Sequence, residues 1–154
     1  MEKIYFKIEE MIDSIRNISE QLTNANFDPE VIISVNRGGC IPGIYLSHYI
    51  EKPHQVINLE LRDSAKDPDL DTIKEKIRQF SSVLIIDDIN DSGKTIGVIK
   101  GLSKNLTTKI HFAVLINKSE SESNVEYYGK TVNSKENDYW YVFPWENWWK
   151  LNEK

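Results

Sequence analysis

Two hydrophobic periods run along the chain, and they predict different kinds of element. In the first part of the chain, apolar residues recur at steps of three and four, which places them on one face of a helix. They are Ile8, Met11, Ile12, Ile15, Ile18 and Leu22. Short runs rich in β-branched residues predict buried strands instead. Three such runs occupy residues 31–35, 82–87 and 109–117.

Further elements are predicted between and after these runs. Helices are expected at residues 41–50, 72–80 and 94–106, and strands at 55–61, 125–132 and 139–143. Because strands and helices alternate, the chain should form right-handed βαβ units around a mostly parallel sheet. We therefore expect an α/β fold with a mostly parallel central sheet flanked by helices. In such a fold, ligands bind beyond the carboxyl ends of the strands.

Composition and charge narrow the class of protein. The 154 residues fit a single domain, expected to span 1–154. A net charge of −5 without a Lys/Arg block argues against a nucleic-acid partner. No apolar stretch approaches the length of a membrane span, and the first residues lack the apolar region of a signal peptide. Because Cys40 is the one cysteine, an internal disulfide is excluded, and a cytoplasmic location is expected.

The stretch 83–95, VLIIDDINDSGKT, holds the candidate chemistry. A hydrophobic strand ends in Asp87 and Asp88, Asp91 follows, and residues 92–95 open a predicted helix. A turn at a helix N-terminus presents free backbone N–H groups and the positive end of the helix dipole. The pattern therefore predicts a phosphate site beside a group of carboxylates.

Three other interpretations account for less of this pattern. Residues 93–95 fit the end of a Walker A loop, but Asp88 stands where the first glycine belongs. A phospho-receiver domain needs its acidic pair after the first predicted strand, which here ends in Asn36 and Arg37. An acidic turn that only caps a helix needs one acid rather than three.

Residues 83–95 resemble the motif with which type I phosphoribosyltransferases bind phosphoribosyl pyrophosphate (PRPP). The resemblance implies that Asp87 and Asp88 hold the ribose hydroxyls. It also implies that residues 91–95, the phosphate loop, bind the 5′-phosphate through backbone N–H groups and the hydroxyls of Ser92 and Thr95. Carboxylates beside the ribose would stabilise the positive charge that develops as pyrophosphate leaves. A fixed 5′-phosphate would orient the sugar.

Residues 35–39, VNRGG, resemble the family's pyrophosphate loop. The resemblance implies that Arg37 and the Gly38 backbone meet the leaving group, and that Arg37 and Asp91 are the catalytic residues. Asn36 departs from the Ser or Pro of many relatives. The implied PRPP-binding residues are Arg37, Gly38, Asp87, Asp88, Asp91, Ser92, Gly93, Lys94 and Thr95.

The resemblance also implies which residues hold the base. An acid at Asp91 is typical of relatives that use 6-oxopurines, where it can hold the proton on purine N7. Lys118 resembles the lysine that donates to the purine O6, an oxygen that adenine lacks. Residues 140–146, WYVFPWE, resemble the late segment of xanthine-guanine enzymes. Trp140 should then stack on the purine, and the Tyr141 backbone should contact its edge.

An activity and an assembly follow from the same resemblance. It implies transfer of the phosphoribosyl group from PRPP to guanine, xanthine or hypoxanthine, in purine salvage, by a homodimer or homotetramer. Mg²⁺ is the implied cofactor, held by Asp87 and Asp88 directly or through water. The resemblance implies a core at about 31–120 and a small hood over the base at about 121–150, with or without the N-terminal helix.

Several points stay open on the sequence alone. The base could be another one, or the protein could be a non-catalytic sensor of PRPP or nucleotides with the same fold. Residues 62–71 fall where the family has a lid, from which either Arg62 or Lys66 could reach pyrophosphate. Glu146 either assists a metal or lies on the surface. Trp148 and Trp149 are expected in the core or at a subunit interface.

Overall fold

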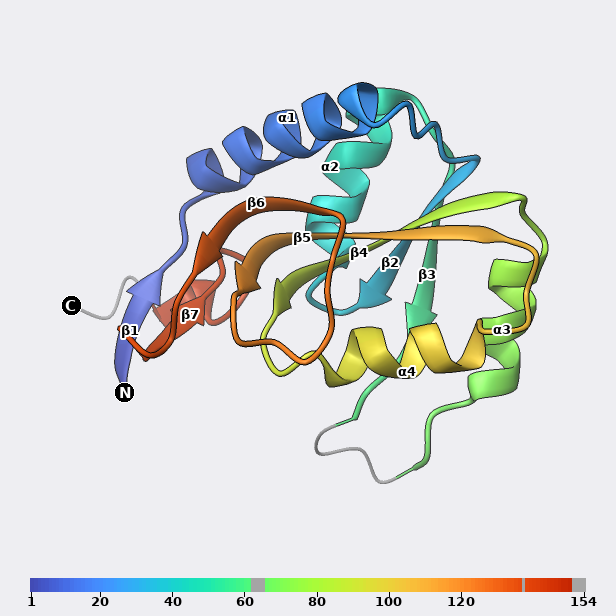
Figure 1. Ribbon diagram of the computed structural model, residues 1–154. Helices are drawn as coiled ribbons and strands as arrows, with labels where there is room; N and C mark the ends of the chain where they lie inside the picture. The colour runs from blue at the N-terminus through green and yellow to red at the C-terminus, as the bar shows by residue number, and fades with distance from the viewer. Residues whose placement is uncertain (62–65, 137, 151–154) are drawn as a thin grey trace.

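The computed structural model describes residues 1–61, 66–136 and 138–150, and its centre is a five-stranded sheet (Figure 1). The strand order is β3-β2-β4-β5-β6, and all neighbouring strands are parallel. The strands are β2 (Val31–Asn36), β3 (His54–Asn58), β4 (Ser82–Asn90), β5 (Lys109–Lys118) and β6 (Tyr127–Val132). The predicted α/β fold with a mostly parallel sheet is confirmed.

Helices cover both faces of this sheet (Figure 1). One face packs against α1 (Ile8–Asn24) and α2 (Cys40–Ile50), the other against α3 (Leu70–Arg78) and α4 (Lys94–Leu102). Successive residues of a strand point to opposite faces, so both sets of side chains must be apolar. Ile32 lies in the core on the α1 side and Ile33 in the core on the α3 side, which explains the continuous apolar runs.

The N-terminal helix forms where the three-four period predicted it. The Lys7 N–H donates to the Glu10 carboxylate at 2.9 Å, which satisfies one free N–H at the start of α1. The buried face of α1 comprises Met11, Ser14, Ile15, Ile18 and Leu22. This face packs on β6, β5 and α2, so α1 is part of the central layers.

A second, two-stranded sheet stands beyond the end of the central one. It pairs β1 (Glu2–Tyr5) in parallel with β7 (Tyr139–Val142), so segments from the two ends of the chain lie side by side (Figure 1). β1 was not predicted, because a strand of four residues is too short to show a clear hydrophobic period. We call β1 and β7 the small sheet.

The structure divides the segment predicted as a hood. The sequence places the hood at about 121–150, but β6 continues the central sheet through its pairing with β5, from Ala113↔Tyr127 to Lys118↔Val132. Only β7 of the two late strands leaves the central sheet. A 3-10 turn, Trp148–Lys150, follows it. Among the described residues, no helix combines the length and apolarity needed to cross a membrane.

Candidate active site

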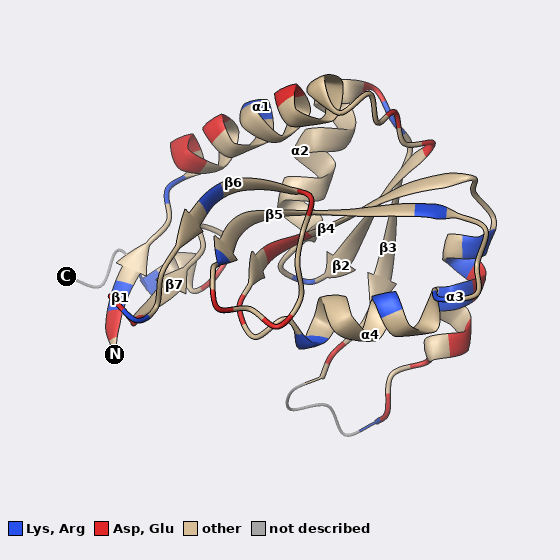
Figure 2. Ribbon diagram, viewed as in Figure 1, with Lys and Arg blue, Asp and Glu red and all other residues tan. Residues whose placement is uncertain are grey.

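Most of the predicted site residues come from the carboxyl ends of three neighbouring parallel strands. Arg37 and Gly38 follow β2, Asp87 and Asp88 lie on the last part of β4, and Lys118 ends β5. Because β2 and β5 both pair with β4, these ends meet at one edge of the sheet. Figure 2 shows acidic residues at this end of β4. Groups far apart in the sequence thus share one site.

The phosphate loop, residues 91–95, turns into α4 at a left-handed glycine. Gly93, the residue just before the first turn of α4, has φ +88°. Residues with a Cβ rarely adopt this backbone conformation. The Lys94 N–H lies 3.4 Å from the Ser92 hydroxyl. The Lys94 side chain is exposed, whereas Ser92 and Thr95 are partly buried. The loop therefore presents a helix N-terminus with adjacent hydroxyls, as an anion site requires.

The loop after β2 lies against the acids of β4. A Cβ added at Gly38 would overlap the Asp88 carboxylate, so only glycine allows this close approach. The Asn36–Arg37 peptide bond is cis, and Arg37 is exposed. Asn36 donates to the Asn58 side chain at 2.8 Å, and the Cys40 thiol lies 3.3 Å from the Asn36 amide oxygen. The asparagine that departs from many relatives therefore ties this loop to β3.

The surroundings of Asp87 and Asp88 on β4 strongly disfavour the charged form of each carboxyl. Burial, reinforced by the charge of Asp88, raises the pKa of Asp87 well above its usual value. Burial, with a further contribution from the charge of Glu146, raises the pKa of Asp88 to about 6, although the Ile89 N–H at 2.7 Å opposes the shift. Two such carboxyls favour a ligand that brings a cation or hydroxyl donors.

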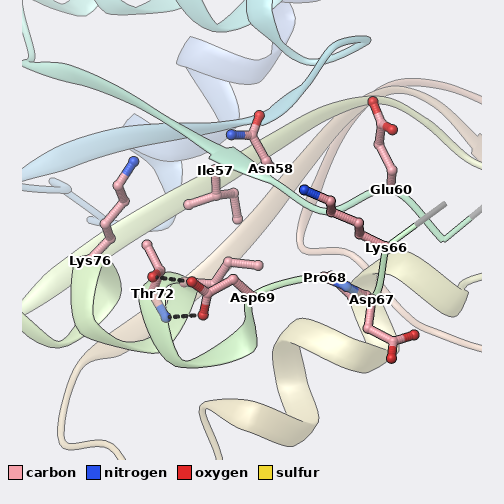
Figure 3. A pocket seen from close by; sticks show the side chains of 10 residues that line it. Ile57, Asn58, Glu60, Lys66, Asp67, Pro68, Asp69, Thr72 and Lys76 are labelled. Carbon is pink, nitrogen blue, oxygen red and sulfur yellow. Dashed lines mark hydrogen bonds between the residues drawn. The ribbon is translucent and has the colours of Figure 1, made fainter. Parts of the chain in front are cut away.

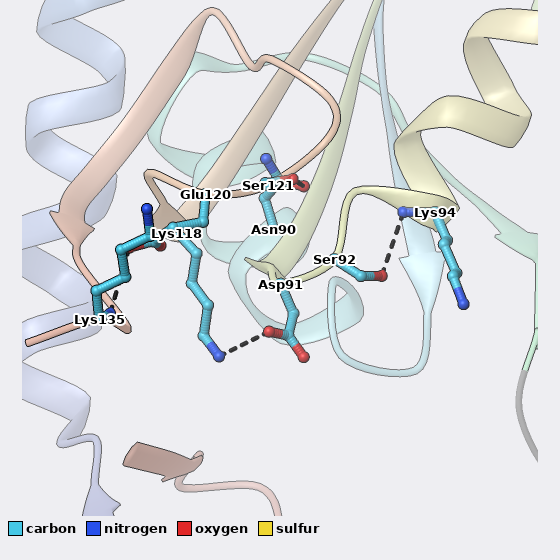
Figure 4. A network of polar contacts seen from close by, with 8 residues as sticks. All are labelled: Asn90, Asp91, Ser92, Lys94, Lys118, Glu120, Ser121 and Lys135. Atoms are coloured by element: carbon cyan, nitrogen blue, oxygen red, sulfur yellow. Dashed lines mark hydrogen bonds and ion pairs between the residues drawn. The ribbon is translucent and has the colours of Figure 1, made fainter. Parts of the chain in front are cut away.

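Asp91 and Lys118, two of the residues predicted to hold the base, form an ion pair (Figure 4). The Lys118 Nζ lies 2.7 Å from Asp91 Oδ1, and the side chains are 14% and 42% exposed. The Lys118 ammonium also lies near Tyr141. Burial raises the pKa of Tyr141, and the positive charge of Lys118 opposes this increase. Three of the four predicted base contacts are therefore grouped at the junction of the central and small sheets.

The fourth predicted base contact and the later aromatics differ in exposure. Trp140 lies on β7 and is 49% exposed, so its ring is open to solvent. Trp145 stacks on Phe143 with ring centroids 5.1 Å apart and packs against the core. Trp148 and Trp149 contact each other edge to face and are 63% and 54% exposed, which excludes a place in the core of this chain.

Glu146, whose role the sequence left open, is directed toward the acids of β4. Its carboxylate accepts from the Phe143 N–H at 2.9 Å, and its own N–H donates to the Phe143 carbonyl at 2.9 Å. This tight turn holds Glu146 where its charge raises the pKa of Asp88. Within the described ranges, no group of three His, Cys, Asp or Glu side chains forms a metal site. A metal bound here would need further ligands from water or substrate.

A cavity of about 310 Å³ opens beside the carboxyl end of β3 (Figure 3). Asn58, Glu60, Lys66 and Asp67 line it together with the start of α3, where Asp69 accepts from the Thr72 N–H at 3.0 Å. Lys66, one of two candidates for reaching pyrophosphate, therefore lies in this cavity. Arg62, the other candidate, lies outside the described residues.

One polar network at the site was not predicted. Asn90 ends β4, is 2% exposed and bonds to Asn117 of β5 and to residues 121–123. The available signal was a polar residue at the end of each of two strands otherwise rich in Val and Ile. Sequence alone does not reveal that the two asparagines pair.

These features together define a class of enzyme. A parallel α/β sheet carries an acid pair, a glycine-containing phosphate loop and a second glycine loop at one edge. The family model described as a phosphoribosyl transferase domain matches residues 2–150. The chain belongs to the phosphoribosyltransferase family, and the resemblance predicted from residues 83–95 and 35–39 is confirmed.

Individual relatives narrow the comparison. A xanthine-guanine phosphoribosyltransferase of Desulfotalea psychrophila (strain LSv54 / DSM 12343) is 28% identical over 118 residues, covering 75% of this chain and 69% of the relative. The crystal structure of a purine phosphoribosyltransferase from Pyrococcus horikoshii Ot3 superimposes with a TM-score of 0.72 at 28% identity, covering 96% and 95% of the two chains. A Helicobacter pylori xanthine-guanine-hypoxanthine phosphoribosyltransferase shares the fold, with a TM-score of 0.72 at 22% identity and 97% coverage of both chains.

Proposed function

We propose that the protein transfers the phosphoribosyl group of PRPP to a 6-oxopurine, which yields the nucleoside monophosphate and pyrophosphate. The single observation that carries this proposal is the Asp91–Lys118 ion pair, 2.7 Å long, next to the phosphate loop. It combines a proton acceptor and a pure hydrogen-bond donor at the base end of the site. The names of the relatives support the same choice of a purine.

The ion pair suits one edge of a 6-oxopurine. The base presents the O6 acceptor and the N7–H donor side by side on this edge. Lys118 can only donate, so it would bond to O6, while Asp91 would accept the N7 proton as N9 attacks the ribose. Adenine would place an amino group against the Lys118 ammonium, and two donors cannot satisfy each other. The pair therefore favours guanine, xanthine or hypoxanthine.

The remaining loops suit PRPP. Asp87 and Asp88 would accept from the ribose hydroxyls and stabilise the positive charge that develops on the sugar. The phosphate loop, residues 91–95, would hold the 5′-phosphate through its N–H groups. Arg37 and the Gly38 backbone would meet the pyrophosphate, which leaves with negative charge.

We also propose Mg²⁺ as the cofactor. Asp87 and Asp88 fit such an ion, since burial and neighbouring acids raise their pKa values and a cation would favour the charged carboxylates. With only two carboxyls on β4, most ligands would come from PRPP and water. Bound there, the ion would offset charge on the leaving pyrophosphate.

Assembly and location belong to the same proposal. We expect a homodimer or homotetramer, because one face of α2 exposes Ile44, Tyr45 and Tyr49, and Trp148 and Trp149 are exposed as well. Light scattering coupled to gel filtration measures this mass directly. A cytoplasmic location is proposed with it.

The test is turnover of PRPP with Mg²⁺ against guanine, xanthine, hypoxanthine, adenine and orotate. Wild type should form a 6-oxopurine nucleotide, and Asp91→Ala should lower kcat by about 100-fold or more, as expected for loss of a general base. Asp13→Ala on α1, whose aspartate is 78% exposed, is the matched control and should keep full activity.

Other outcomes would redirect the assignment. Turnover of adenine or orotate by wild type would overturn the choice of base while leaving the family intact. PRPP binding without turnover of any base would support the second candidate, a non-catalytic sensor.

A further inference from the structure

The connection between β5 and β6 lies directly behind the phosphate loop. We call residues 119–126, which make this connection, the crossover loop. A Cβ added at Gly93 would come within 2.6 Å of the Ser121 hydroxyl and 2.5 Å of the Ser123 N, so the two loops are packed without space between them. The crossover loop carries no residue assigned to substrate binding above.

Two carbonyls of the phosphate loop accept hydrogen bonds from the crossover loop. The Glu122 N–H donates to the Ser92 carbonyl at 3.1 Å, and the Ser123 hydroxyl donates to the Gly93 carbonyl at 2.8 Å. In a trans peptide the C=O and the following N–H point in opposite directions. Directing these carbonyls toward the crossover loop therefore directs the Gly93 and Lys94 N–H groups away from it, into the phosphate site.

Asn90 fixes the crossover loop in turn. Its amide oxygen accepts from the Ser121 hydroxyl at 2.8 Å (Figure 4). Its amide nitrogen donates to the Asn117 side chain at 2.9 Å and to the Ser123 carbonyl at 2.8 Å. Asn90 is 2% exposed and is one of three buried polar residues among those described, with Ser14 and Ser34. A buried amide with three bonds holds one orientation, because losing any of them is costly.

The network also reaches the base end of the site. Asn117 directly precedes Lys118 on β5, and the Ser121 N–H donates to the Lys118 carbonyl at 3.1 Å. The same few residues thus lie between the phosphate loop and the lysine of the Asp91–Lys118 pair. Their bonds run to backbone carbonyls and to each other.

We propose that Asn90, Ser121 and Ser123 are positioning residues for the 5′-phosphate of PRPP, which they serve by orienting the peptide groups of the phosphate loop. This inference rests on the proposed function. It assigns a role in substrate binding to a loop that the family motifs do not include. A site preorganised in this way spares PRPP the free energy of ordering the loop.

The experiment compares Ser123→Ala and Asn90→Leu with Ser103→Ala. Ser103, at the far end of α4, has a buried hydroxyl with no hydrogen-bond partner in the described chain, so it is the matched control. The readouts are the KM for PRPP, the KM for the base, and the inhibition constant of inorganic pyrophosphate, each with a melting temperature. Pyrophosphate is expected to bind at the loop after β2, so its inhibition constant should not depend on the orientation of the phosphate loop.

We expect Ser123→Ala to raise the KM for PRPP about fivefold, the change that the loss of one hydrogen bond typically causes. Asn90→Leu should raise this KM about tenfold or more, because it removes three hydrogen bonds. Pyrophosphate inhibition should stay within about twofold of wild type in Ser123→Ala, and Ser103→Ala should leave all three constants unchanged. If Asn90→Leu does not fold, Ser123→Ala alone decides, since it removes one hydroxyl from a partly exposed loop.

Two results would overturn the inference. The first is an unchanged KM for PRPP in Ser123→Ala, and the second is an equal rise in the PRPP and pyrophosphate constants. If wild type turns over no base, calorimetric titration with PRPP replaces the KM, and weaker PRPP binding in Ser123→Ala would still support the positioning role. Wild type that does not bind PRPP at all would overturn both this inference and the proposed function.

Discussion

At the scale of single residues, the acid pair of β4 shows how binding chemistry competes with stability. Burial on folding raises the pKa of Asp88 to about 6 and raises that of Asp87 well above its usual value, so the folded chain holds protons that the unfolded chain releases. Stability should therefore be highest at low pH for these groups and should decline as the pH rises from about 4 through 6. Keeping both acids buried at neutral pH therefore lowers the stability of the fold, which suits their proposed role in binding ribose hydroxyls and Mg²⁺.

Asp88→Asn should stabilise the folded protein at pH 7.5, because a neutral amide removes this cost and can still accept from the Ile89 N–H. We expect a gain on the order of 1–3 kcal/mol in the free energy of unfolding, which shrinks toward zero at pH 4, where Asp88 is protonated. Urea unfolding at both pH values measures the difference. A gain that is the same at both values would rule out titration of Asp88 as its cause. PRPP affinity should fall in the same variant.

At the scale of elements, two glycines at opposite ends of α4, Gly93 just before the helix and Gly101 near its last residue, differ in surroundings. Gly93 precedes the helix with φ +88° and touches the crossover loop, whereas a Cβ at Gly101, near the helix end, meets nothing within 4 Å. Glycine inside a helix is unfavourable relative to alanine, but at a left-handed position it is favoured.

The two alanine substitutions should therefore act in opposite directions. Gly101→Ala should raise the free energy of unfolding by about 0.5–1 kcal/mol, and Gly93→Ala should lower it by at least about 1 kcal/mol and raise the KM for PRPP. Thermal unfolding and PRPP kinetics of both variants give the comparison. A Gly93→Ala variant with normal stability and PRPP affinity would contradict our account of the phosphate loop.

The elements also show what local sequence can and cannot predict. Apolar periods predicted α1 and the cores of β2, β4 and β5, because those patterns are set by burial within each element. β4 was predicted to end at residue 87, yet it runs to Asn90, since pairing with β5 continues through Ile89↔Ile116 and Asn90↔Asn117. Whether polar residues at the end of a strand remain part of it depends on pairing with the neighbouring strand.

The candidate site divides in the same way. Asp87, Asp88 and residues 91–95 could be found from one continuous motif, because the chain itself places them in sequence. The bonds of Asn90 could not, because their partners Ser121 and Ser123 lie on a loop whose path is fixed by the pairing of β5 with β6. The residues proposed to bind PRPP form a continuous motif, whereas the partners of Asn90 are distant in the sequence.

At the scale of the whole molecule, the small sheet joins segments far apart in the sequence beside the residues proposed to hold the base. β1 pairs with β7, which carries Trp140 and Tyr141, and Phe6 packs against Phe143 with ring centroids 5.3 Å apart. The Lys130 Nζ, 3.2 Å from Glu10, lies over the Tyr141 ring and joins β6 to this unit. The residues proposed to hold the base are thus supported from outside the central sheet.

A chain lacking residues 2–5 should keep Phe6 and the central sheet but lose the partner of β7. We expect the KM for the purine to rise roughly threefold to tenfold, with the KM for PRPP within about twofold of wild type, because β1 pairs with β7 alone. Steady-state kinetics with each substrate varied in turn gives both constants. Equal changes in both would mean that β1 supports the whole fold rather than the base end.

The pairing of β1 with β7 also sets an order of assembly during synthesis. Glu2 is synthesised before the central sheet, and its partner Tyr139 is added only after all five strands of that sheet. At about 5–20 residues per second this delay is on the order of 10 s. The nascent chain can thus complete the strands that carry the acids and the phosphate loop while β1 still has no partner. β7, which carries Trp140 and Tyr141, can pair with β1 only afterwards, so closing the loop between distant segments comes last.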